Sequence, residues 1–218
     1  MIILAIFTVC AAYLIGSISF AVIFTKYFSK KDIRDFGSKN AGATNATRVG
    51  GKKVGALTFL CDCLKGTVAA LIGRFVFAYI FAKTGLAWAM PIYGAYACGV
   101  ACMLGHVFPC FFEFRGGKGV ATGAGVFFAI CPLAGGIGLA TFILMIMLTR
   151  IVSVSSLCGT FATVLTAIIC YDTDALFLPQ MIYAVLMAAI IFVKHTENIK
   201  RLFSGEEKKI SFGGKKNG

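Results

Sequence analysis

The sequence predicts an all-α integral membrane protein, a polytopic bundle of about seven transmembrane helices. Of its 218 residues, 59% are hydrophobic and only 14% are charged, whereas soluble domains carry roughly 25% charged residues. The mean hydropathy is +0.87, and the charged residues gather between long apolar runs. These observations exclude a soluble domain and a disordered chain, which requires low hydrophobicity. We expect residues 1–218 to form one integral-membrane domain.

Six uninterrupted apolar runs are candidates for membrane spans, because about 20 helical residues cross the hydrocarbon core. The run from 120 to 149 is too long for one span at a rise of 1.5 Å per residue, and Pro132, Gly135 and Gly136 interrupt it. Two helices in this run give seven crossings, and five spans plus a re-entrant pair are the alternative. The runs cover residues 2–25, 54–82, 86–104, 120–149, 151–171 and 176–194.

The net charge of +12 comes mainly from two basic segments, residues 26–53 and 194–218. The positive-inside rule places both in the cytoplasm, which requires an odd number of crossings. The N-terminus then lies outside, and the loop at 105–119 and the C-terminus are cytoplasmic. Because the basic segments flank apolar spans, we expect contacts with membrane lipid and anionic substrates, and no nucleic acid.

The polar residues of the chain gather in the segments expected on the cytoplasmic side, which is typical of an enzyme that works at that surface. Transporters more often place polar groups at mid-membrane on broken helices. The second span is the exception, because it carries Asp62 and Lys65, which are three residues apart and can pair along a helix face. We interpret them as a structural pair.

The nine cysteines lie almost entirely within apolar runs, where a free cysteine behaves as a small hydrophobic residue. The chain has only two histidines and shows no zinc-ligand spacing. We therefore expect no metal and no organic cofactor.

The first polar segment, residues 32–53, predicts a short helix over residues 43–49, with Ser38 as a candidate helix cap. Asn40, Thr44 and Arg48 follow at intervals of four, so we expect their polar ends to share one face. Amide, hydroxyl and guanidinium groups that converge in this way favour a bound phosphate. A hydrated basic loop held by anionic lipid headgroups is the alternative.

The second polar segment, residues 105–123, carries Gly116-Gly117-Lys118-Gly119 directly before an apolar run. Glycines let the backbone approach an anion, and a helix start offers unpaired N–H groups. Because Lys118 is followed by glycine instead of serine or threonine, this is not a nucleotide-binding P-loop. A phosphate site is one interpretation, and a turn that merely joins two helices is the other.

The third polar segment, residues 194–210, places His195 and Asn198 three residues apart on one predicted helical face. His195 and His106 are the two histidines of the chain, and both fall in segments expected to be cytoplasmic. That coincidence favours a functional role over a bystander role.

Five stretches together resemble the bacterial membrane glycerol-3-phosphate acyltransferases that use acyl-phosphate as the donor. They agree with the family in order and spacing, and the chain length fits. One departure is Ser19, where the family usually has proline. The stretches are GSISF (16–20), IRDFGSKNAGATNATR (33–48), DCLKG (62–66), GHVFPCFFEFRGGKGVATG (105–123) and HTENIKRLFSGEEKKI (195–210).

The resemblance implies an acyltransferase of the bacterial cytoplasmic membrane with its active site on the cytoplasmic face. It would transfer a fatty acyl group from acyl-phosphate to the 1-hydroxyl of sn-glycerol 3-phosphate. The products would be lysophosphatidate and phosphate, in the first step of phospholipid synthesis. The enzyme that makes acyl-phosphate is a candidate partner.

The resemblance also implies roles for individual residues. His195, Asn198 and Lys118 are expected to be catalytic, and Glu207 is expected to be structural. Glycerol phosphate is expected at Ser38, Asn40, Asn45 and Arg48, to which the helical spacing adds Thr44. Acyl-phosphate is expected at Gly105, His106, Gly116, Gly117, Lys118, Gly119 and Thr122.

The chemistry of the residues agrees with this assignment. Acyl-phosphate is already an activated anhydride, so positioning the hydroxyl and neutralising the departing phosphate can supply most of the rate. No nucleophilic serine or cysteine with an adjacent base is evident. We expect substrate-assisted transfer, in which the donor's own phosphate accepts the proton and both histidines orient phosphates. A small-anion transporter and a membrane scaffold are the competing interpretations.

Overall fold

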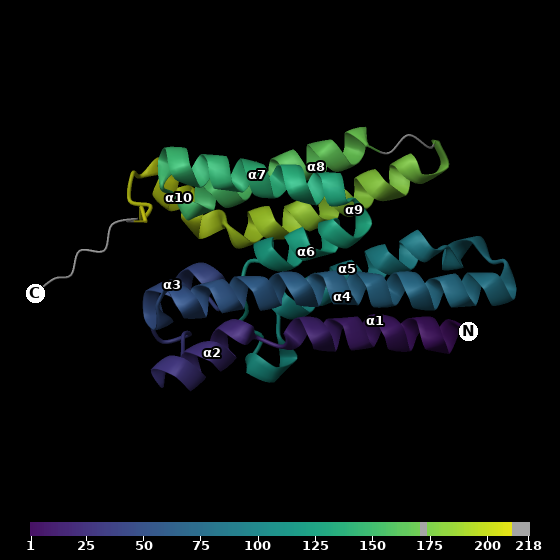
Figure 1. Cartoon of the computed structure of the whole chain (residues 1–218), viewed down its shortest axis with the longest axis horizontal. Coiled ribbons are helices and arrows are strands. Elements are labelled where there is room, and N and C mark those ends of the chain that lie inside the picture. Colours follow the sequence, from purple (N-terminus) through teal and green to yellow (C-terminus); the bar gives the residue numbers. More distant parts are fainter. Residues whose placement is uncertain (171–173, 211–218) are drawn as a thin grey trace, which may run out of the picture. The chain divides into compact units, whose positions relative to one another are not determined.

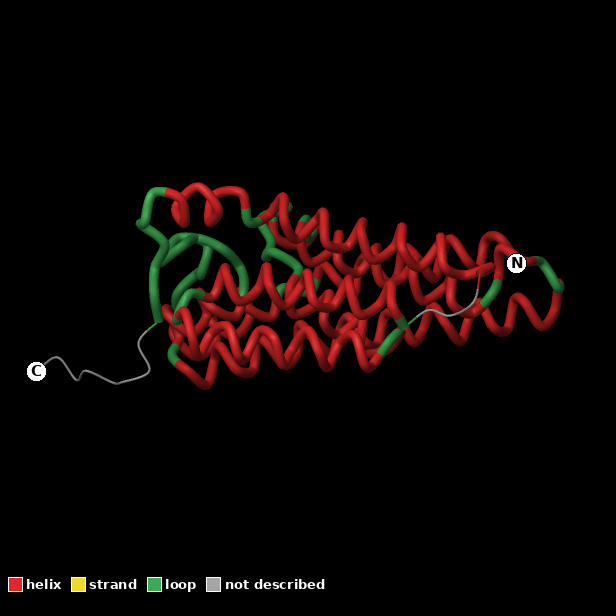
Figure 2. Tube along the Cα trace, turned by 90° about the horizontal axis from the view of Figure 1, so that it is seen from above, coloured by secondary structure: helices red, strands yellow, loops and turns green. Residues whose placement is uncertain are grey.

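The computed structural model describes residues 1–170 and 174–210, and this part of the chain consists of helices and loops without a strand (Figure 2). The prediction of an all-α fold is confirmed. The chain divides into two compact units, Met1–Gly135 and Gly136–Gly218. The expectation of a single domain over residues 1–218 stays a prediction.

The long helix α4 is the centre of the first unit, and α1, α5 and α6 all pack against it (Figure 1). Its end at Gly85 follows from a left-handed backbone with φ of 65°, which glycine adopts without strain. Pro91 begins α5 at the position where its missing N–H costs nothing. The elements of this unit are α1 (Ile2–Ser17), α2 (Phe20–Ser29), α3 (Ala43–Gly50), α4 (Lys52–Thr84), η1 (Ala87–Ala89), α5 (Pro91–Val107), η2 (Cys110–Phe112) and α6 (Val120–Ile130).

Glycines let these helices approach backbone to backbone. A Cβ atom added at Gly125 of α6 would lie 1.9 Å from the carbonyl oxygen of Cys63 on α4. The same construction at Gly73 would bring a Cβ within 2.1 Å of the Gly94 carbonyl oxygen on α5. Small residues at such crossings are typical of membrane helices, which gain dispersion contacts when their backbones are close.

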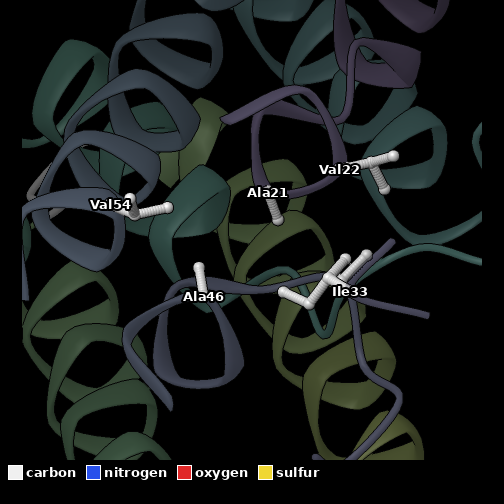
Figure 3. Close-up of a cluster of buried hydrophobic side chains, with 6 residues drawn as sticks. Ala21, Val22, Ile33, Ala46 and Val54 are labelled. Carbon is white, nitrogen blue, oxygen red and sulfur yellow. The ribbon is translucent and has the colours of Figure 1, made fainter. Parts of the chain in front are cut away.

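A small apolar cluster fixes α3 beside α2 and α4. Its buried members include Ala21 and Val22 of α2, Ile33 of the following loop, Ala46 of α3 and Val54 of α4 (Figure 3). Because these residues come from four successive parts of the chain, their burial sets the path of the loop between α2 and α3. The helix predicted over residues 43–49 is confirmed as α3.

The second unit contains most of α7 (Pro132–Thr149), which begins in the first unit, together with α8 (Val152–Ile169), α9 (Asp174–Lys194) and α10 (Thr196–Phe203). Helices α7 and α8 approach closely, because a Cβ at Gly138 would lie 1.8 Å from the hydroxyl oxygen of Thr163. Helix α10 is bent by 59° from α9. The chain after α10 returns to the start of α8, where the Ile210 N–H donates to the Arg150 carbonyl oxygen at 2.8 Å.

The protein is a multi-pass membrane protein by the length and hydropathy of its described helices. Five helical segments are long and apolar enough to cross a membrane, and the bent pair α9 and α10 raises the number to six. The break at Cys131 confirms the expected division of residues 120–149 into two helices. Helix α6 has 11 residues, about 16 Å at 1.5 Å per residue, which is short of a full span. Seven crossings, with the N-terminus outside, stay a prediction.

Candidate functional site

The loop between α2 and α3 is held by an ionic cluster around Asp32. Its carboxylate lies 2.8 Å from the Arg34 guanidinium and 2.9 Å from the Lys26 ammonium. Hydrogen bonds from Arg34, with a further one from Lys26, outweigh burial and hold the pKa of Asp32 well below its ordinary value. Asp32 therefore stays ionised and keeps both cations in place.

Arg34 also joins the first polar segment to the second. Its Nη1 donates to the carbonyl oxygen of Phe112 at 3.3 Å and lies 3.4 Å from Oε1 of Glu113. Nearby carboxylates raise the pKa of Arg34 further, chiefly through its hydrogen bond with Asp32. Sequence reasoning missed this residue. The Asp-x-Arg spacing was the available signal, because it lets the two side chains meet within one turn.

Asn45 organises the loop before α3 with both ends of its side-chain amide. Its Oδ1 accepts the Ser38 N–H at 3.0 Å, and its Nδ2 donates to the carbonyl oxygens of Phe36 at 2.9 Å and Ile33 at 3.3 Å. The prediction that Ser38 caps the helix is wrong, since α3 begins after Gly42 and Ser38 contributes a backbone N–H to Asn45. The burial of Asn45 at 1% exposure makes it part of the loop's framework.

Helix α3 presents two of the three residues expected on one face. Thr44 and Arg48 are four residues apart within the helix, whereas Asn40 precedes it and lies in the loop. The expectation of a common helical face is therefore wrong for Asn40, because the helix starts three residues later. Arg48 is exposed, and no acidic side chain in the described ranges pairs with it.

The second polar segment folds back so that its glycines touch the end of α5. The Gly117 N–H donates to the carbonyl oxygen of His106 at 3.1 Å. A Cβ at Gly117 would lie 2.2 Å from Nε2 of His106 and 2.9 Å from the carbonyl oxygen of Ala41. Gly117 is thus a second point, besides Arg34, where the first and second polar segments meet, and only glycine fits there.

The glycine turn leads directly into the N-terminus of α6. Gly119 has φ of 84° and is the residue before the helix, so the first amides of α6 have no acceptors within the helix. Thr122, in the first turn, is fully buried, and its hydroxyl oxygen has no hydrogen-bond partner among the described residues. Unpaired donors at a helix N-terminus favour an anion.

A buried ionic group lies beneath this turn. Lys65 pairs with Asp62 at 2.9 Å, which confirms the pair expected from their spacing. His106 Nδ1 lies 3.5 Å from the same Asp62 oxygen. His106 could not be predicted as a third member from the sequence, because α4 and α5 meet only in the folded chain. Gly105, one residue earlier, lets α5 approach α1, since a Cβ there would lie 2.1 Å from the Tyr13 carbonyl oxygen.

The third polar segment is organised within the second unit. His195 lies at the bend between α9 and α10, and its Nδ1 donates to the Ile191 carbonyl oxygen at 2.8 Å. The Asn198 amide donates to Oε1 of Glu207. His195 and Asn198 are both buried, at 2% and 8% exposure.

Glu207 ties the chain after α10 to two helices. Its Oε1 also accepts from the Ser153 hydroxyl of α8 at 2.8 Å, and its Oε2 accepts from Nε of Arg201 at 2.8 Å. Burial alone would raise the pKa of Glu207, but hydrogen bonds from Asn198, Arg201 and Ser153 lower it below its ordinary value. This geometry agrees with the structural role expected for Glu207.

The family model of the glycerol-3-phosphate acyltransferases matches residues 6–205. The chain belongs to this family. Curated glycerol-3-phosphate acyltransferases from Thermoanaerobacter sp. (strain X514) and Bacillus anthracis are each 42% identical to it, over 206 and 205 residues. These alignments cover 94% of this chain in both cases, and 96% and 98% of the relatives.

Solved structures of the family share the fold. A crystal structure of PlsY, described as an integral membrane glycerol 3-phosphate acyltransferase in its glycerol 3-phosphate form, matches with a TM-score of 0.80 and 36% identity. It covers 95% of this chain and 96% of that protein. A second structure of PlsY, in its lysophosphatidic acid form, matches with a TM-score of 0.79. The protein is therefore a membrane acyltransferase of lipid biosynthesis, which rules out the transporter and scaffold interpretations as its primary activity.

Proposed function

We propose that the protein transfers a fatty acyl group from acyl-phosphate to the 1-hydroxyl of sn-glycerol 3-phosphate. The hydroxyl oxygen forms an ester bond with the acyl carbon while the bond from that carbon to the phosphate oxygen breaks. The departing phosphate accepts the hydroxyl proton, so the products are lysophosphatidate and inorganic phosphate. This would be the first step of bacterial phospholipid synthesis.

The observation that carries this proposal is the meeting of the two polar segments at Gly117. Both substrates bear a phosphate, and an enzyme that joins them needs two anion sites close together. Arg48, exposed and without an acidic partner in the described chain, lies on the first segment. Lys118 and the N-terminus of α6 lie on the second. Charge-assisted hydrogen bonds of these kinds are the strongest available for phosphate.

The glycerol phosphate would bind along the first segment, and the acyl-phosphate at the glycine turn. The buried hydroxyl of Thr122 supports the second assignment, because a bound phosphate would supply its missing partner. For glycerol phosphate we retain Ser38, Asn40, Thr44, Asn45 and Arg48, with Asn45 acting through the loop that it holds. For acyl-phosphate we retain Gly105, His106, Gly116, Gly117, Lys118, Gly119 and Thr122.

His195 and Asn198 of the second unit are proposed to be needed for turnover, together with Lys118. We also propose that the basic segments and the site lie on the cytoplasmic face of the bacterial cell membrane. The glycerol 3-phosphate form of the related PlsY structure supports the acceptor. The enzyme that produces acyl-phosphate remains the proposed partner.

One assay tests the reaction. Purified protein in lipid nanodiscs receives palmitoyl phosphate and glycerol 3-phosphate, and both phosphate release and lysophosphatidate are measured. We expect one phosphate per lysophosphatidate, and no product when palmitoyl-CoA replaces the acyl-phosphate. Product formed from the thioester but not from acyl-phosphate would overturn the proposed donor.

Two variants test the proposed anion sites. Arg48→Ala and Lys118→Ala each remove a cation, and we expect losses of at least about tenfold in kcat/KM, the value of one charge-assisted hydrogen bond. Lys53→Ala is the matched control, because Lys53 is an exposed lysine at the end of the first segment, in the first turn of α4. Equal effects of all three variants would contradict the assignment.

A further inference from the structure

The Asp62 cluster consists of Asp62 and Lys65 on α4 and His106 in the last turn of α5. Asp62 Oδ1 is the shared contact, 2.9 Å from Lys65 Nζ and 3.5 Å from His106 Nδ1. All three are buried, with exposures of 2%, 5% and 7%. Burying charged groups costs free energy unless they are paired. The contacts of each member of the cluster therefore indicate its role.

The Lys65 ammonium contacts the backbone as well as Asp62. Besides Asp62, its ammonium donates to the carbonyl oxygens of Gly16 at 2.9 Å and Ile18 at 2.8 Å. These carbonyls lie at the break between α1 and α2, where helical acceptor groups lose their usual donors. Lys65 thus makes two hydrogen bonds to backbone carbonyl oxygens and an ion pair with Asp62. The role of Lys65 is therefore to hold the break and to neutralise Asp62.

His106 has different neighbours at its two ring nitrogens. Nδ1 faces the Asp62 carboxylate, and Nε2 faces Gly117, where an added Cβ would approach to 2.2 Å. A carboxylate only accepts hydrogen bonds, so it favours the ring forms that carry hydrogen on Nδ1. The other nitrogen is then presented to the turn formed by Gly116–Gly119.

We propose that Asp62 is a positioning residue for acyl transfer, which holds His106 with hydrogen on Nδ1 and directs Nε2 to a phosphate at the glycine turn. This inference rests on the proposed function, in which acyl-phosphate binds at that turn. A carboxylate on one side of the ring and a phosphate on the other favour hydrogen on both nitrogens, so that Nε2 donates to the phosphate. Asp62 itself touches no substrate and acts through His106.

The state of the ring can be observed directly, because the chain has only two histidines. Protein labelled with 15N-histidine is placed in lipid nanodiscs, and His195→Gln assigns the His106 signals. We expect the hydrogen of wild-type His106 on Nδ1. In Asp62→Asn, a neutral amide replaces the carboxylate that faces Nδ1, so we expect the share of His106 with hydrogen on Nδ1 to fall and hydrogen on Nε2 to appear.

Kinetics separate positioning from a purely structural role. For Asp62→Asn we expect the KM for palmitoyl phosphate to rise about tenfold, which corresponds to one charge-assisted hydrogen bond. The KM for glycerol 3-phosphate should stay within about twofold, less than any lost hydrogen bond would cause. Asp62→Glu keeps a carboxylate and should restore both the Nδ1 signal and most of the affinity for palmitoyl phosphate.

Lys65→Met is the matched control, because it breaks the same buried pair and leaves Asp62 facing His106. It should lower the melting temperature at least as much as Asp62→Asn does, yet keep the Nδ1 signal and the wild-type KM for palmitoyl phosphate. The proposal is overturned if Asp62→Asn keeps both wild-type properties. It is also overturned if Lys65→Met raises that KM by the same factor.

The two proposals can fail independently. If the wild-type protein transfers no acyl group from palmitoyl phosphate, the proposed function is wrong. The spectra of Asp62→Asn and Lys65→Met then still show whether Asp62 sets the hydrogen position on His106. If transfer occurs and the spectra of these two variants agree with each other, only the positioning role is lost.

Discussion

A single carboxylate, Asp32, governs the loop that we assign to glycerol phosphate. Because its pKa in the folded protein lies below the ordinary value of 3.8, folding favours the ionised form. The stability that it contributes is complete above that ordinary value and is lost as the pH falls towards the folded-state pKa.

We therefore expect the melting temperature of the wild-type protein to fall more steeply below about pH 4 than that of Asp32→Asn, which lacks this titrating group. Thermal unfolding in nanodiscs, followed by differential scanning fluorimetry from pH 3 to 7, measures both curves. Asp35→Asn is the control, since Asp35 is an exposed acidic neighbour. Parallel curves for the wild type and Asp32→Asn would contradict the prediction.

Glu207 gives the second prediction at this scale. Glu207→Gln turns one of the two accepting oxygens into an amide nitrogen that only donates, so at least one of the three hydrogen bonds is lost. We expect a loss of about 1–3 kcal/mol in unfolding free energy. Limited proteolysis should also cut the segment after α10 sooner. Glu206→Gln, at the exposed neighbouring position, should leave both measurements unchanged. Equal behaviour of the two variants would argue against the structural role of Glu207.

Local spacing predicts some side-chain contacts and misses others. The Asp62 and Lys65 pair followed from a separation of three residues on one helix. His106 could not be added to the pair from the sequence, because its contact depends on how α5 packs against α4. The resemblance placed Asn45 among the residues for glycerol phosphate, yet its amide is used by the loop, since buried backbone groups there needed partners.

At the scale of elements, close helix crossings depend on glycines. Gly125→Ala would place a methyl group 1.9 Å from a backbone oxygen of α4, and α6 would have to move away. We expect a loss of about 1–3 kcal/mol, the range for overpacked interiors. Gly136→Ala is the control, because a Cβ there meets nothing within 4 Å. Detergent-induced unfolding of both variants measures the difference, and a similar cost for each would be inconsistent with close packing.

Gly117 is the corresponding position in the connection between α5 and α6. Gly117→Ala would push against the His106 ring and the Ala41 backbone at once, so the two polar segments must separate. We expect kcat/KM to fall by at least about tenfold, because small misplacements of catalytic groups carry large rate costs. The melting temperature should change less than in Gly125→Ala. Wild-type activity in Gly117→Ala would show that the meeting point is not used in turnover.

The order of the helices could be predicted from apolar runs, and the short helix α3 from its polar spacing. The start of α3 at Ala43 was predicted correctly, but its cap was not, because Ser38 looked like a cap while Gly42 stands at that position. The division at Pro132 was correct, since a proline at the first helical position starts a helix readily. The 11-residue length of α6 could not be deduced, because the apolar run continues through the break.

At the scale of the whole molecule, the charge distribution predicts the orientation of the chain. Both basic segments should be cytoplasmic, so green fluorescent protein fused after residue 218 should fluoresce in cells. Alkaline phosphatase fused at the same place should be inactive, because it needs the oxidising side of the membrane. A fusion of alkaline phosphatase within the 105–119 loop should likewise be inactive. An active fusion at either place would contradict the predicted orientation.

Composition alone was sufficient to identify the class of protein, since few soluble chains carry so little charge. The family followed from five stretches in fixed order, and its acyltransferase activity is confirmed. The number of crossings did not follow, because a re-entrant helix and a full span have the same hydropathy and differ in length.

Arg34 restricts the movement of the first polar segment relative to the second. Its guanidinium contacts the Phe112 carbonyl oxygen and Glu113 while it remains bonded to Asp32. Any displacement of one polar segment must therefore either break these contacts or carry the other segment with it. If the two proposed phosphate sites lie on these segments, we expect binding at one to change the affinity of the other, and thermodynamics requires such a linkage to act equally in both directions.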